Sequence, residues 1–77
     1  MADDFVVEQA SEGAIRIRHA PEGHRYSFFI SPDERGRRRF AAGHVRAEES
    51  AKRSAASFEI EAFRHAKREA RRLGLID

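Results

Sequence analysis

Apolar and polar residues alternate along the first half of the chain. Ile15 and Ile17 alternate with Arg16 and Arg18, and a period of two is typical of a strand with one buried face. Other runs are rich in aromatic and β-branched residues, and segments containing Gly or Pro separate them as turns. We therefore predict an antiparallel meander of three or four strands, at about residues 4–9, 13–20, 24–31 and 37–46.

The period becomes helical after residue 57. Apolar side chains then recur at steps of three and four, namely Ala62, Phe63, Ala66, Ala70 and Leu73, which indicates an amphipathic helix over about residues 58–73. Ser57 is expected as the N-cap, and Gly74 stands where a C-cap is expected. Residues 47–56 are rich in alanine but lie off the later stripe, so a helix extended back toward 47, a separate helical turn and a loop all stay open.

These elements predict one α+β domain over residues 1–77, a meander with a C-terminal helix packed on one face. The expected core sets Phe63 and Leu73 against the inner face of the sheet, formed by Ile15, Ile17, Phe28 and Ile30. A chain this short buries about 60% of its unfolded surface. Because cysteine is absent, no disulfide can stabilise it, and a second subunit, hence a homodimer, becomes the leading expectation.

Charge is unevenly distributed, although the net charge is only +2. Residues 1–12 carry four acidic and no basic side chains, whereas residues 13–46 carry eight arginines against three acidic groups. A basic field can attract nucleic acid or an acidic protein. Because nearly all the basic residues are arginine, a genomic bias in base composition explains the excess equally well.

Two basic surfaces follow from the predicted elements. If one helix covers one face of the sheet, the other face carries Arg16, Arg18, Arg25, Phe29 and Arg39. Arginines around an exposed ring are typical of sheets that bind single strands, although Phe29 could instead be covered by the N-terminal segment or by a partner. The helix carries the second surface, namely Arg64, Lys67, Arg68, Arg71 and Arg72, which we interpret first as a solvated face opposite the apolar stripe.

Catalysis and cofactors find no support in the sequence. It contains no nucleophile elbow, phosphate loop, dinucleotide fingerprint or paired-histidine motif. His19 and His24 flank one turn, but two imidazoles without a carboxylate or thiolate make a poor metal site, and a turn histidine is usually polar surface. We therefore expect no enzyme, no cofactor and no metal.

The C-terminal stretch resembles the end of some small uncharacterised bacterial domains. The likeness rests on Ser57-Phe58-Glu59-Ile60-Glu61-Ala62 and continues through His65-Ala66 and Ala70 to Leu75-Ile76-Asp77. In those domains a few strands precede a closing helix that is entered through a similar Ser-Phe segment. The resemblance covers about a quarter of the chain, implies the architecture already derived, and assigns no site residues.

The sequence thus predicts a small non-catalytic binding module. Its partner is a protein or a second copy of the chain, with nucleic acid as the alternative. The longest apolar run is Phe28-Phe29-Ile30 and the N-terminus is acidic. We therefore expect a cytoplasmic protein that does not act at a membrane.

Overall fold

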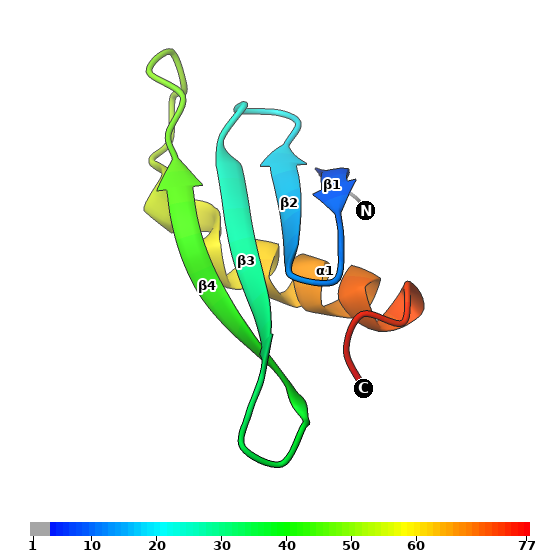
Figure 1. The fold of residues 1–77 in the computed structure, drawn as a ribbon. Helices are drawn as coiled ribbons and strands as arrows, with labels where there is room; N and C mark the ends of the chain where they lie inside the picture. Colours follow the sequence, from blue (N-terminus) through cyan, green and yellow to red (C-terminus); the bar gives the residue numbers. More distant parts are fainter. Residues whose placement is uncertain (1–3) are drawn as a thin grey trace.

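The computed structural model describes residues 4–77 and shows a four-stranded antiparallel sheet with one helix packed behind it (Figure 1). The elements are β1 (Phe5–Ala10), β2 (Ala14–His19), β3 (Arg25–Pro32), β4 (Arg38–Arg46), a 3₁₀ turn η1 (Ala55–Phe58) and α1 (Glu59–Arg72). The strands lie side by side in chain order. The predicted α+β meander with a closing helix is confirmed, and each predicted element boundary lies within one residue of the observed one.

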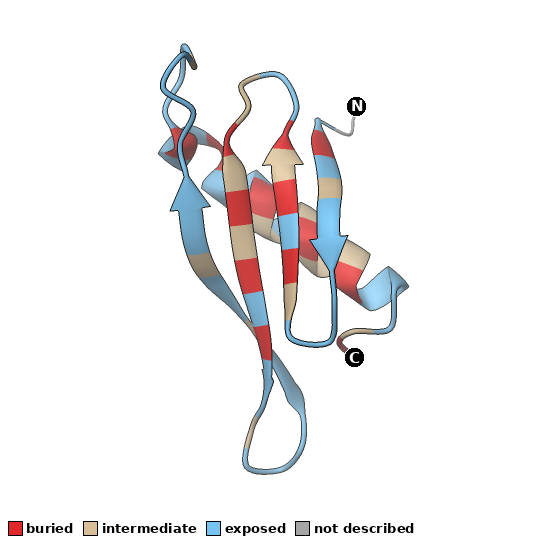
Figure 2. Cartoon of the chain, turned by 45° about the horizontal axis from the view of Figure 1, so that its top comes forward, coloured by how far each residue is buried: buried red, intermediate tan, exposed pale blue. Residues whose placement is uncertain are grey.

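The alternation along β2 and β3 sorts their side chains between the two faces of the sheet. Ile15 and Ile17 of β2 are buried on the side of the sheet that carries α1, as are Tyr26, Phe28 and Ile30 of β3. Figure 2 shows buried residues alternating with more exposed ones along both strands. The side that faces α1 is called the inner face below, and the opposite side is the outer face.

Alanines make the contact between α1 and the sheet. Ala62, Ala66 and Ala70 have no exposed surface, and their small side chains let the helix backbone approach the strands closely. Phe63 is half-buried. The prediction that Leu73 is buried is wrong, because its side chain is 43% exposed. In Figures 1 and 2 the C-terminal turn of α1 extends beyond the β1 edge of the sheet.

Gly74 ends the helix and turns the chain back under the sheet. Its φ of 76° lies in the left-handed region, which favours glycine. The Leu75 N–H donates to the Ala70 carbonyl at 2.8 Å, a bond typical of the Schellman motif. Ile76 then packs on Ile30 and Ala70 and fills the position expected for Leu73.

The N-terminal end of α1 differs from the prediction. The turn η1 precedes the helix, so Phe58 occupies the N-cap position without a capping side chain. Ser57 is therefore not the N-cap, and its hydroxyl lies 3.1 Å from that of Ser54. Residues 47–54 form an irregular loop. The loop is thus the correct alternative for this segment, and the helix does not extend back to 47.

His24 fastens this loop to the sheet. Its Nδ1 accepts a hydrogen bond from the Glu48 N–H at 3.0 Å. Its Nε2 lies 2.8 Å from the Arg53 carbonyl oxygen, which can only accept, so Nε2 carries the proton. His19 is also buried, with its ring stacked on that of Phe58 at 4.0 Å. The expectation that these turn histidines are surface residues is wrong, because both are part of the core.

Tyr26 makes a third tie to the same segment. Its hydroxyl donates to the Ala55 carbonyl at 2.7 Å. Burial, together with the charges of Glu59 and Glu61, raises the pKa of Tyr26 to about 12. The phenol is therefore a permanent donor at neutral pH and holds η1 against β3.

Candidate binding surfaces

The structure brings the five residues of the first candidate surface onto the outer face of the sheet. Their register places them in successive rows across the strands, because Arg18 lies opposite Arg25, Arg16 opposite Ser27, and Ser31 opposite Arg39. No element of residues 4–77 packs over this face (Figure 1). The members that share it are Arg16, Arg18, Arg25, Phe29 and Arg39.

Arg46 joins the outer face, although sequence reasoning missed it. Tyr26 pairs with Val45 and Phe28 pairs with Ala42, so a bulge adds a residue to β4 between them. The bulge reverses the alternation and places Arg46 opposite Arg25. Three arginines of β2, β3 and β4 therefore lie side by side in one row, and like charges in that arrangement are destabilising.

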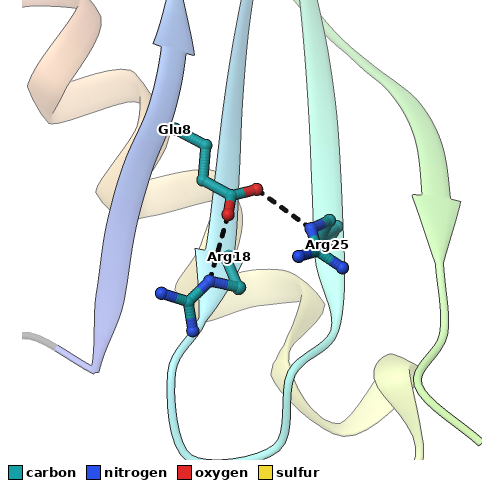
Figure 3. A network of polar contacts seen from close by, with 3 residues as sticks. All are labelled: Glu8, Arg18 and Arg25. Carbon is teal, nitrogen blue, oxygen red and sulfur yellow. Dashed lines mark hydrogen bonds and ion pairs between the residues drawn. The ribbon is translucent and has the colours of Figure 1, made fainter.

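Glu8 partly neutralises this row (Figure 3). Its two carboxylate oxygens accept hydrogen bonds from Nε of Arg18 at 3.1 Å and from Nε of Arg25 at 3.0 Å. Desolvation by itself would raise the pKa of Glu8, but the hydrogen bonds from Arg25 and Arg18 outweigh it and lower the pKa below the usual value. Glu8 is therefore ionised at neutral pH and bridges two strands.

Phe29 lies on β4 rather than beneath another segment. Its ring is 43% exposed and stands edge-on to His44 at 5.8 Å. A Cβ added at Gly43 would lie 2.2 Å from Phe29 Cε2, so the ring occupies the space that this glycine leaves empty. Beside the ring is a hollow of about 90 Å³, whose lining includes Gln9, Arg16, Ser27 and His44 as well as Ala14 and Ile15.

The inner face of β4 borders the second candidate surface, a groove that we call the α1–β4 groove. The helix packs mainly on β1, β2 and β3. On the inner face of β4 it covers Phe40, whereas Val45 stays exposed. The groove encloses about 640 Å³. Its sheet side is formed by Tyr26, Phe28, Ala42 and Val45, and its helix side by Glu59, Ile60, Phe63, Arg64, Lys67, Arg68 and Arg71.

Phe28 and Phe63, which line this groove, belong to a cluster of aromatic rings. Phe63 stands edge-on to Phe28 at 5.9 Å and to Phe40 at 5.3 Å. The side chain of Ile60 is 69% exposed and that of Val45 is 44% exposed. The lining of the groove thus combines a packed aromatic cluster with two exposed apolar side chains.

Basic side chains form the helix wall of the groove. Arg64, Lys67, Arg68 and Arg71, from the second candidate surface, all line it, and the Lys67 ammonium lies 5.6 Å from the Phe63 ring centre. Arg72 does not, because its guanidinium bonds Glu69 Oε1 at 2.8 Å.

Ala62, Ala66 and Ala70 form the buried stripe of α1. Counted at 100° per residue, the four basic side chains lie on the other side of the helix from this stripe, beside the exposed Ile60. The exposed Ile60, four residues before Arg64, was the available sequence signal for this groove.

Within residues 4–77, no three His, Asp or Glu side chains are grouped to hold a metal ion. The same residues include no helix that is long and apolar enough to cross a membrane. No protein-family model, curated protein or solved structure matches the chain, so the resemblance of its C-terminal stretch stays an expectation.

Proposed function

We propose that this chain is a protein-binding module whose α1–β4 groove takes an acidic, amphipathic segment of a partner protein. The observation that carries the proposal is the exposure of Ile60 and Val45 beside a wall of four cations. An exposed apolar floor with a polar rim is typical of protein interaction sites.

The two parts of the groove select different features of the partner. Burial of the exposed part of Ile60 would contribute about 1–2 kcal/mol, so the partner needs apolar side chains on one face. Arg64, Lys67, Arg68 and Arg71 face a single lining carboxylate, Glu59. Electrostatic complementarity then favours a segment with carboxylates along its edge.

Charge also bears on the homodimer expected from the length of the chain. Two copies that met groove to groove would set one basic wall against another, and like charges across an interface disfavour association. We therefore propose a different, acidic protein as the occupant of this groove.

A pair of short peptides tests the proposal. One carries Leu on one helical face and Glu on the other, and the second has Lys in place of every Glu. We expect the acidic peptide to bind in a fluorescence anisotropy titration and the basic peptide not to bind, because only the acidic one complements the wall. Equal binding of both peptides, or no binding of either, would refute the proposal.

Matched variants locate the binding. Ile60→Ala should lower the affinity for the acidic peptide about 5- to 10-fold, because less apolar surface is buried on binding. Leu73→Ala, which removes an exposed apolar side chain outside the groove, should leave the affinity unchanged. Arg68→Glu should weaken binding more than Arg35→Glu, which makes the same change of charge in the β3–β4 turn. Equal effects within either pair would place the peptide elsewhere.

A further inference from the structure

We propose a second, separate site on the outer face of the sheet, which binds single-stranded nucleic acid. In this site Arg16, Arg39 and Arg46 contact phosphates and Phe29 stacks on a base. The site lies on the opposite side of the sheet from the α1–β4 groove and does not depend on it. The charge, the aromatic ring and the shape of that face support this site.

Three arginines of the outer face are free to bind an anion. Arg16, Arg39 and Arg46 are exposed and make no ion pair or side-chain hydrogen bond within residues 4–77. Arg25 lies directly between Arg18 and Arg46 across the strands, an arrangement that destabilises the free protein. A polyanion that lies over these rows would remove the repulsion and release its counterions.

Phe29 supplies the contact that distinguishes a nucleic acid from other polyanions. The backbone of Phe29 lies between the row of Arg16 and the row of Arg39, and its ring leans over Gly43. A base on the ring would therefore have arginines on both sides of it. The neighbouring hollow offers hydrogen-bonding groups of Gln9, Ser27 and His44 to the edge of that base. Stacking on an aromatic ring tolerates any base, since every base has a π-face.

The shape of the face favours a single strand over a duplex. Four strands spaced about 4.8 Å apart make a surface about 14 Å wide between the outer backbones. The major groove of B-DNA is about 12 Å wide and admits a helix or a two-stranded ribbon. A duplex also keeps its bases stacked on one another, where Phe29 cannot reach them.

Glu8 acts within this site as a competitor for phosphate. Its carboxylate holds Arg18 and Arg25 at 3.1 and 3.0 Å, so these two guanidiniums are engaged before a strand arrives. A phosphate must displace the carboxylate in order to bind them. Removal of the Glu8 charge should therefore tighten binding, which is the most specific consequence of this arrangement.

The probe is a fluorescein-labelled oligothymidylate, measured by anisotropy at several salt concentrations, with inorganic polyphosphate as a polyanion that has no bases. Contacts to three phosphates predict a log–log salt slope of about −2, and Arg39→Gln should reduce its magnitude by about 0.7. Arg35→Gln, in the β3–β4 turn, should leave the slope unchanged. Phe29→Ala should lower the affinity for the oligonucleotide about 5- to 100-fold and leave the salt slope unchanged. It should not change the affinity for polyphosphate.

A second pair of variants is independent of Phe29. Glu8→Gln should raise the affinity for the oligonucleotide about 2- to 10-fold, because two arginines are released from exposed ion pairs. Glu12→Gln changes the net charge equally but lies in the β1–β2 turn, so it should have a much smaller effect. Lack of oligonucleotide binding at low salt, or equal effects of these two variants, would overturn the proposal. Equal loss of polyphosphate binding in Phe29→Ala would do the same.

Discussion

Replacement of Gly43 by alanine tests the arrangement of Phe29 on β4 directly. The new Cβ would lie 2.2 Å from Phe29 Cε2, more than 1 Å inside ordinary contact, so the ring must move outward. Overpacking of this kind costs about 1–3 kcal/mol. Alanine is otherwise the better strand residue by about 0.5–1 kcal/mol, and Gly43 does not use the left-handed conformation. The net expectation is a loss of about 0.5–2 kcal/mol.

The sign should reverse when the ring is absent. In a Phe29→Ala background nothing blocks the new methyl group, so Gly43→Ala should stabilise the protein by about 0.5–1 kcal/mol. The coupling between the two positions should then amount to about 1–3 kcal/mol. Urea unfolding of the four proteins, followed by circular dichroism, measures it. A coupling below about 0.5 kcal/mol, or stabilisation by Gly43→Ala in both backgrounds, would show that the ring does not occupy this space.

Three further predictions concern the fold. His24→Ala should lower the free energy of unfolding by about 2–4 kcal/mol and speed amide exchange at Glu48, because that N–H and the Arg53 carbonyl lose their partner; unchanged exchange would contradict the anchoring role. Because the raised pKa of Tyr26 favours the neutral phenol in the folded state, its stabilising effect is complete below pH 10. About 2–3 kcal/mol should be lost as the pH rises toward 12, and in urea unfolding at several pH values Tyr26→Phe should flatten this dependence. Gly74→Ala should lower the free energy of unfolding by about 1–2 kcal/mol in the same urea assay, because the φ of Gly74 is 76°. Ser57→Ala should change it little, and a comparable loss would contradict the absence of a side-chain cap on α1.

The strands and the helix could be predicted because local patterns determine them. The alternation of Ile15, Arg16, Ile17 and Arg18 allows a single arrangement in which one face is buried. The same logic placed Arg25 and Phe29 on the outer face. Each of these assignments depends on a regular period within one element, and the sequence displays that period directly.

The errors arose where packing between elements decides the outcome. A helical wheel gives the direction of Leu73 but not the point where α1 passes the edge of the sheet, so its exposure could not be predicted. The bulge in β4 lies where the Phe29 ring packs over Gly43, a contact between two strands. It reversed the side on which Arg46 lies, and hence kept this residue out of the candidate set.

The α1–β4 groove was missed for a related reason. It exists because the helix packs mainly on three strands and leaves Val45 of β4 exposed, and no local pattern specifies how far a helix reaches across a sheet. His24 shows the same limit. Its bonds to Glu48 and Arg53 join residues far apart in the chain, so a turn histidine could not be recognised as part of the core.

The most direct test of the proposed protein-binding groove is a two-dimensional ¹H–¹⁵N NMR titration of the labelled protein with the acidic amphipathic peptide. The proposal predicts that the largest shift changes occur at Val45, Ile60 and Phe63 and along the basic wall of α1, while Phe29 and Arg16 on the outer face stay unchanged. Shift changes centred on the outer face, or spread evenly over the basic residues of both faces, would contradict it.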